Sequence, residues 1–368
     1  MNDNTKIAKN FTVGDWKDLR KKLKINERLN WDEAFNVFRD RISSRFLDPI
    51  EKIQHDGKKE GEGFSIALIS VVLLEFLAAF DLGLIYKNFK DDNNKPPNEY
   101  KDSKTLLKKF ILKSDIFKNQ FTSNKLISKF YDDIRCGLVH QARTLGNNSI
   151  ISNDSRKNIQ PDNFYFKSET KEEHILNRDL FLTKIHEHID YYRHNILVNQ
   201  DESTRRLFIM KIDEIAGLKH VWYFIYGSNL YENQLTERLN DLKDNYFIMQ
   251  RCSLRGYKFT YNKLSTQDKT AKGNLIEMSD EITEGVAILL LEETFNSFIK
   301  INEKGYEKKL VKLNLSSNQE IKFDGYTCIS TNFTNAKPSI DYKTKVVEGA
   351  KEKGLPEKYI TDNLNTKR

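Results

Sequence analysis

The turn Tyr226-Gly227-Ser228-Asn229-Leu230 has the composition of an anion-binding turn. It follows the apolar run Trp222–Tyr226, which predicts a buried strand, and it precedes a helical stretch. Small residues at the end of a strand leave successive backbone N–H groups accessible, and such groups bind carboxylates and phosphates. An ordinary strand-to-helix turn can have the same residues, so this turn alone does not identify a ligand.

A second candidate site consists of Arg135 and His140 at the end of a predicted helix. Near pH 7 a neutral imidazole can accept the proton of a 2′-hydroxyl, and a guanidinium can pair with a phosphate. On a straight helix the two side chains point about 140° apart. They therefore converge only if the helix bends at Gly137 or if a dimer assembles the site. The alternative is a packing or capping histidine beside a surface arginine.

Other residues with chemically active side chains give weaker signals. Glu75 lies within an apolar helical run and either pairs with Arg135 or faces solvent. His186, His188 and His194 form a local group, but residues two apart lie on different faces of a helix. The spacing therefore predicts no metal site.

The composition predicts a soluble, cytoplasmic protein. The chain has 368 residues, of which 31% are charged and 38% hydrophobic. Its first 24 residues are polar and of mixed charge, and the longest apolar run, Phe64–Leu74, is too short to span a bilayer. Three widely spaced cysteines and the lack of a glycine-rich phosphate loop predict no disulfide scaffold, metal or cofactor. We therefore expect no membrane partner.

The positive charge is concentrated in one block of the sequence. The formal net charge is +7, and residues 101–150 alone contain ten basic and four acidic side chains. This block surrounds Arg135 and His140. It predicts either contact with RNA or a solvated helix face.

The first part of the chain has helical periodicity. The stripe of Phe35, Phe38, Ile42 and Phe46 follows a predicted Asn30 cap. Asn- and Ser-rich or Pro-containing stretches at 88–104 and 145–162 predict loops. Further helices are expected at 64–86, 105–113, 125–138, 171–197 and 202–215. These elements predict an all-α domain over residues 1–200, followed by a helical linker over 201–217.

The second part, residues 218–368, is rich in strands. Continuous or alternating apolar runs predict strands at 222–226, 254–261, 285–291, 308–315 and 325–329. Helices are expected at 233–243, 292–301 and 342–353, with Gly354 just after the last one. The predicted fold class is therefore α+β with two domains, the second a small mixed β-barrel.

A series of motifs in this second part carries a family resemblance. The Tyr226–Leu230 turn is followed in order by several others with similar gaps. These are Leu254-Arg255-Gly256-Tyr257, Pro338-Ser339-Ile340-Asp341-Tyr342, Gly349-Ala350 and Gly354-Leu355-Pro356-Glu357-Lys358-Tyr359. From about Val221 to Leu364, roughly two-fifths of the chain, the series resembles the γ-glutamylcyclotransferase-like family.

The resemblance implies a reaction in which the α-amino group of a γ-glutamyl amine or peptide attacks its own γ-carbonyl and forms 5-oxoproline. It implies Glu303 as the acid/base, although an alignment through Asn296-Ser297 places Asn302 at that position. One carboxyl can remove the ammonium proton and protonate the leaving nitrogen. The implied substrate-binding residues are Tyr226, Gly227, Ser228, Asn229, Leu230, Tyr306 and Tyr342.

The Arg135-x(4)-His140 pair, in its helical setting, is similar to the ribonuclease motif of the HEPN superfamily. That similarity implies metal-independent RNA cleavage, with a homodimer formed through the helical domain. The alternative function is therefore that of an RNA-binding or RNA-cleaving toxin or defence protein. In that case the second domain would be a ligand-binding or regulatory pocket.

Overall fold

The computed structural model describes residues 1–55, 61–88, 94–121, 123–153, 163–168, 171–242 and 244–365. The chain divides into two compact units, one of Met1–Tyr86 with Tyr100–Ala216 and one of Lys87–Glu99 with Gly217–Arg368. The predicted α+β class, helical first and sheet-containing second, is confirmed. Lys243 and parts of the predicted loops 88–104 and 145–162 lie outside the described residues.

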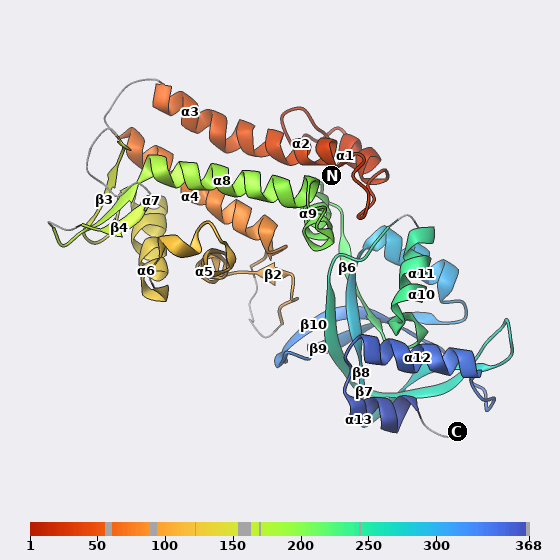
Figure 1. Cartoon of the computed structure of the whole chain (residues 1–368). Coiled ribbons are helices and arrows are strands. Elements are labelled where there is room, and N and C mark those ends of the chain that lie inside the picture. The colour runs from red at the N-terminus through yellow and green to blue at the C-terminus, as the bar shows by residue number, and fades with distance from the viewer. Residues whose placement is uncertain are drawn as a thin grey trace. The chain divides into compact units, whose positions relative to one another are not determined.

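Helices form most of the first unit (Figure 1). Several begin at side-chain caps, such as Asp102, which accepts hydrogen bonds from the N–H groups of Lys104 and Thr105. The helical elements are α1 (Val13–Arg20), α2 (Trp31–Ile42), η1 (Ser43–Leu47), α3 (Asp48–His55), α4 (Glu62–Asp81), α5 (Ser103–Lys113), η2 (Lys118–Gln120), α6 (Asn124–Lys129), η3 (Phe130–Cys136), α7 (Gly137–Gln141), α8 (Arg178–Leu197) and α9 (Glu202–Ile215).

The central helix of this unit is α4, which is apolar on nearly all faces. Among the described residues it is the single helix whose length and composition would allow it to cross a membrane, and 56% of its apolar window is buried. It packs against α5, α8 and α9. Buried side chains such as Val71, Leu74 and Leu77 place it in the hydrophobic core of the unit.

The prediction that this unit is all-α is wrong. The strands β3 (Asn148–Ile151), β5 (His174–Asn177) and β4 (Tyr165–Lys167) form a three-stranded sheet in that order. A two-stranded sheet joins β1 (Ile85–Tyr86) and β2 (Glu99–Tyr100). Strands of two to four residues are too short to show alternation in the sequence. The predicted helix at 171–197 begins only at Arg178, because the strand β5 precedes it.

Two finer predictions for this unit are also wrong. The segment 201–217 is not a linker, because α9 packs against α4 and α8. Its Asp213 is fully buried and accepts hydrogen bonds from Trp16 and Arg20. At the start of α2, Asn30 makes no side-chain cap and instead donates to the carbonyl of Lys22.

Five strands of the second unit close into a barrel in the order β10-β6-β8-β7-β9. Only β6 and β10 pair in parallel, and the other neighbours are antiparallel. The strands are β6 (His220–Ile225), β7 (Met249–Leu264), β8 (Ala271–Leu291), β9 (Glu307–Leu315) and β10 (Asn318–Ile329). Their inward residues, including Leu254, Phe259, Ile288, Leu313 and Phe323, form the core.

Helical segments attach to the barrel: η5 (Ser228–Leu230), α10 (Glu232–Asp241), α11 (Glu292–Asn302), α12 (Ile340–Glu352), α13 (Glu357–Tyr359) and η6 (Ile360–Leu364). The helix α12 packs against η5, the turn that follows β6. Gly354, with a φ of +64°, lies just after the C-cap of α12, as predicted.

Candidate active site

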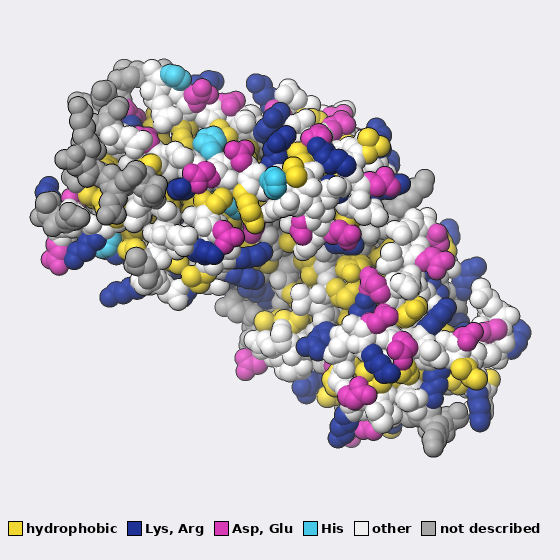
Figure 2. Space-filling model, in the orientation of Figure 1, with side chains coloured by type: hydrophobic (Ala, Val, Ile, Leu, Met, Phe, Trp, Pro, Cys, Tyr) yellow, Lys and Arg dark blue, Asp and Glu magenta, His cyan; other side chains and the backbone are white. Residues whose placement is uncertain are grey.

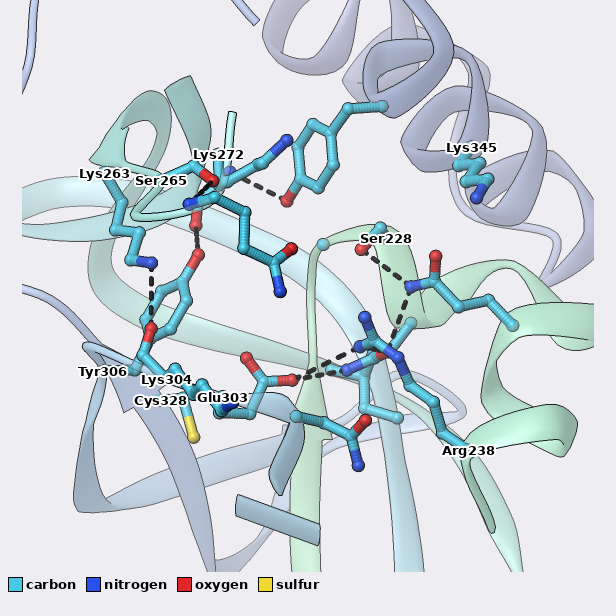
Figure 3. Close-up of a pocket in the computed structure, with 18 of the residues that line it drawn as sticks. Ser228, Arg238, Lys263, Ser265, Lys272, Glu303, Lys304, Tyr306, Cys328 and Lys345 are labelled. Atoms are coloured by element: carbon cyan, nitrogen blue, oxygen red, sulfur yellow. Dashed lines mark hydrogen bonds and ion pairs between the residues drawn. The ribbon is translucent and has the colours of Figure 1, made fainter. Parts of the chain in front are cut away.

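A cavity of about 470 Å³ lies beside the turn that follows β6 (Figure 3). The residues predicted from the motifs supply part of its lining, namely Tyr226, Gly227, Ser228, Asn229, Glu303, Tyr306 and Tyr342. They come from the two residues that follow β6, from η5, from α12 and from the segment between α11 and β9. The barrel therefore brings together residues that lie more than a hundred positions apart in the sequence.

The first residue of the turn anchors it to the barrel. The hydroxyl of Tyr226 donates to the carbonyl of Cys328 on β10, and Asn229 is buried. Leu230 was predicted to bind substrate, but its side chain is fully buried and does not line the cavity. Because Ser228–Leu230 forms a 3-10 turn, Leu230 faces the core rather than the cavity. Its assignment to the binding site is wrong.

Glu303 is positioned by the end of α11, where it is the C-cap residue. Its Oε1 accepts a hydrogen bond of 2.7 Å from Nδ2 of Asn229 and one of 3.4 Å from the hydroxyl of Tyr223. The side chain is 11% exposed. Burial raises the pKa of Glu303 above its ordinary value of 4.5, while Arg238, Asn229 and Tyr223 lower it in part.

The two oxygens of this carboxylate differ in their surroundings. Among the residues that the structure describes, both hydrogen bonds to the side chain of Glu303 reach Oε1, and none reaches Oε2. In Figure 3 the dashed lines at Glu303 all leave from one carboxylate oxygen, and none leaves from the other. One oxygen is therefore fixed by the protein, and the other can accept a proton from a bound molecule.

Tyr306 and Tyr342 both bind the backbone of Gly273 on β8. The hydroxyl of Tyr306 donates to its carbonyl at 2.5 Å, and its N–H donates to the hydroxyl of Tyr342 at 2.8 Å. A Cβ at Gly273 would lie 2.8 Å from the ring of Phe259 and 3.1 Å from the Tyr342 hydroxyl. A glycine is therefore required there for the two tyrosines to hold these positions.

Asn302, the alternative to Glu303, also lines the cavity. It is the last residue of α11, and its side chain makes no hydrogen bond with any described residue. Of these two residues, it is therefore Glu303 whose side chain contacts the turn.

Several charged and polar residues of the cavity were not predicted from the sequence. Gln234 and Arg238 lie on α10 with helical i, i+4 spacing, which would have placed them on one face. Nothing in the sequence indicated that this face meets the turn. Lys272 lies on β8, where its Nζ is 2.7 Å from the carboxylate of Asp268 and 4.7 Å from the ring centre of Tyr342.

Lys263 is the most deeply buried cation of the cavity. It is 5% exposed, and its Nζ donates to the carbonyl of Lys304 at 2.9 Å. The ammonium lies 4.7 Å from the ring centre of Tyr306. Burial lowers the pKa of Lys263, and Glu303 raises it in part. A β-bulge between Tyr261 and Lys263 interrupts the strand, and bulges change the direction of a side chain.

The structure places Arg135 in η3 and His140 in α7. Nε and Nη2 of Arg135 donate to the two oxygens of Glu75 at 2.6 and 3.3 Å, so of the two alternatives for Glu75 the structure shows the pairing with Arg135. The hydrogen bond to Glu75 raises the pKa of Arg135. His140 is exposed. Cleavage of RNA stays a prediction, which loss of cleavage in His140→Ala would test.

Three of the ten basic side chains in the block 101–150 form ion pairs with acidic side chains of the same block, which leaves the block's net positive charge unchanged. Within it, Lys104 pairs with Asp132, Lys118 with Asp115 and Lys129 with Asp133. The face seen in Figure 2 carries basic and acidic side chains intermixed on both units. Among the described residues no group of three His, Cys, Asp or Glu side chains is placed to hold a metal ion. His188 is buried, whereas His186 and His194 are exposed.

Comparison with protein families gives a match in the second unit. Residues 296–362 match the model of the AIG2-like family. This C-terminal segment is therefore similar to the AIG2-like family. It contains Glu303, Tyr306 and Tyr342 but not the turn at Tyr226–Leu230. The match confirms the predicted resemblance of the C-terminal region to γ-glutamylcyclotransferase-like proteins. The HEPN resemblance of the first unit stays a prediction, and no curated protein matches the chain.

Solved structures also match part of this chain. A γ-glutamyl cyclotransferase is 24% identical with a TM-score of 0.35, over 40% of this chain and 88% of that one. A protein from Homo sapiens described as uncharacterized has the same identity and TM-score, over 40% and 87%. A yeast γ-glutamyl cyclotransferase specific to glutathione is 12% identical with a TM-score of 0.32, over 40% and 94%.

Proposed function

We propose that the second unit is a cyclotransferase that converts a γ-glutamyl amine or γ-glutamyl peptide into 5-oxoproline and a free amine. Glu303 is the proton shuttle in this proposal. The observation that carries it is the buried carboxylate of Glu303, which has one oxygen held by Asn229 and the other open to the cavity. The AIG2-like match of residues 296–362 supports the same reaction class.

The reaction needs one group that accepts and then donates a proton. Glu303 takes a proton from the substrate's α-ammonium group, and the free amine attacks the γ-carbonyl carbon. A new C–N bond closes the five-membered ring, and the bond to the leaving nitrogen breaks as Glu303 protonates that nitrogen. The ring nitrogen loses its second proton to solvent, and the released amine takes one up from solvent. Both protons and charge are thereby balanced.

The other cavity residues would hold the substrate in the folded conformation that ring closure needs. Backbone N–H groups of Gly227 and Ser228 would bind the α-carboxylate or the developing oxyanion. Tyr306 and Tyr342 would close the cavity around the glutamyl chain, and Lys263 would favour the negative charge that develops on the carbonyl oxygen. Fixing the attacking nitrogen near the carbonyl is worth several kcal/mol in such intramolecular reactions, roughly 7 or more at best.

The raised pKa of Glu303 suits this shuttle, because a general acid/base works best when its pKa lies near the working pH. For a glutamate with an ordinary pKa, the transfer of a proton from the ammonium group is strongly unfavourable. Burial of Glu303 brings its proton affinity closer to that of the amine. The positive charge of Arg238 offsets part of this rise in the pKa of Glu303.

The test is product analysis with a panel of γ-glutamyl amines and γ-glutamyl dipeptides. We expect 5-oxoproline and the free amine in equal amounts, with no free glutamate. The N-acetylated form of an active compound is the control, because acetylation blocks the attacking nitrogen and should abolish the reaction. Release of glutamate, or turnover of the acetylated compound, would indicate hydrolysis by water and contradict the proposal.

A further inference from the structure

Two residues of α10 surround the amide of Asn229, the residue that holds Glu303. Nη1 of Arg238 donates to Oδ1 of Asn229 at 2.5 Å, and Nε2 of Gln234 donates to the same oxygen at 3.3 Å. Gln234 also donates to the hydroxyl of Ser228 at 2.9 Å. The face of α10 that carries these two side chains therefore contacts the turn at consecutive residues.

These contacts determine which way the Asn229 amide is oriented. A guanidinium has only donors, so the oxygen of the amide must face Arg238. The carboxylate of Glu303 has only acceptors, so the nitrogen of the amide must face Glu303. Its Nδ2 donates to Oε1 of Glu303 at 2.7 Å, and Nη1 of Arg238 lies 3.9 Å from the same oxygen. The arrangement has one satisfied orientation, and the reversed amide would have two repulsive contacts.

We propose that Arg238 and Gln234 are positioning residues, which fix the Asn229 amide so that it holds one oxygen of Glu303 and leaves the other facing the substrate. This inference rests on the proposed function, because only a reaction gives the orientation of Glu303 its purpose. Arg238 acts both through Asn229 and through its own charge, whereas Gln234 acts only through hydrogen bonds. Neither residue needs to touch the substrate.

Other groups around Glu303 act on the same carboxylate and must be held constant in a test. Lys263 on β7 adds positive charge, and Tyr223 donates a weak hydrogen bond at 3.4 Å. The remaining titratable groups that interact with Glu303 are Tyr226, Tyr306, Cys328 and Tyr342, whose own pKa values burial raises. They stay uncharged near neutral pH, so Arg238 and Lys263 are the charges that govern Glu303.

The experiment measures the titration midpoint of Glu303 in the full chain by NMR of 13C-labelled glutamate carboxyl groups, with Glu303→Gln to assign the signal. Removing the charge in Arg238→Met should raise the midpoint by about one pH unit or more, from the Coulomb energy of a charge about 4 Å away. Arg238→Lys should restore most of the wild-type value. Arg255→Met removes an exposed arginine of β7 and should leave the midpoint unchanged. Gln234→Met should shift it by less than Arg238→Met does.

Turnover gives a second readout. At a pH where Glu303 is fully ionised, Arg238→Met should lower kcat by roughly ten- to a hundred-fold with little change in KM, because the carboxylate loses its fixed position. If Arg238→Met does not fold, Arg238→Gln can replace it. Glutamine removes the charge but keeps a polar side chain at this position, where the wild-type arginine is partly exposed. An unchanged midpoint in both neutral variants would overturn the inference. If the wild type forms no 5-oxoproline, the proposed reaction fails, but the midpoints still decide the role of Arg238.

Discussion

At Gly349 the helix α12 packs closely against the end of the turn of the candidate site. A Cβ at this position would lie 2.3 Å from the backbone nitrogen of Tyr231 and 2.5 Å from the carbonyl carbon of Leu230. Real Cβ atoms do not approach other atoms so closely, and backbone atoms cannot rotate away. In Gly349→Ala the helix must therefore move away from the turn by several tenths of an ångström or more.

The size of the effect follows from two opposing terms. Overpacking of a well-packed contact costs about 1–3 kcal/mol. Replacing glycine by alanine inside a helix contributes about 1 kcal/mol in the other direction. The expected net loss is about 1 kcal/mol in the free energy of unfolding, or a Tm lower by about 2–4 °C for a unit of this size. The larger effect is on the site, because a displacement of about 1 Å in a catalytic group can reduce turnover roughly a hundred-fold.

The assay combines thermal unfolding with measurement of 5-oxoproline formation. Thr344→Ala is the matched control, because Thr344 is exposed on the same helix and alanine there raises helix propensity without a clash. We expect the control to be as stable and as active as the wild type, or slightly more stable. A Tm for Gly349→Ala at or above that of the control, together with full turnover, would refute the reasoning.

Three further predictions concern single side chains. Because burial raises the pKa of Glu303, its contribution to stability is present below pH 4.5 and is lost as the pH rises through the raised value. Glu303→Gln should therefore raise the Tm at pH 7, and the difference should vanish near pH 4 in thermal melts. Tyr306→Phe removes the donor to the Gly273 carbonyl and should lower the free energy of unfolding by about 1–2 kcal/mol in urea titrations, with a higher KM. Glu75→Gln leaves the charge of Arg135 only partly satisfied and should cost about 1–3 kcal/mol, and a double-mutant cycle with Arg135→Met should show strong coupling.

Most elements of the second unit could be predicted from the sequence, because their apolar periodicity is strong and each is long. The short strands of the first unit could not, since β3, β4 and β5 have three or four residues each. Their Asn- and Ser-rich surroundings resemble a loop, and β5 merges into the pattern of α8.

Only those residues of the candidate site that belong to a sequence motif could be predicted from the sequence. Glu303 and the small residues of the turn belong to motifs, and the structure brings them together. Arg238 and Lys263 belong to no motif, because their roles depend on which face of α10 meets the turn and on a β-bulge in β7. Leu230 belongs to the motif but faces the core, which only the 3-10 geometry of the turn determines.

The most direct test of the central claim compares 5-oxoproline formation by the wild type and by Glu303→Gln, using the best compound of the γ-glutamyl panel. Glutamine keeps the acceptor for the Asn229 hydrogen bond but cannot take up a proton, so the fold and cavity should persist. We predict that kcat/KM falls by about a hundred- to ten-thousand-fold. Equal rates for the two proteins would contradict the assignment of Glu303 as the proton shuttle.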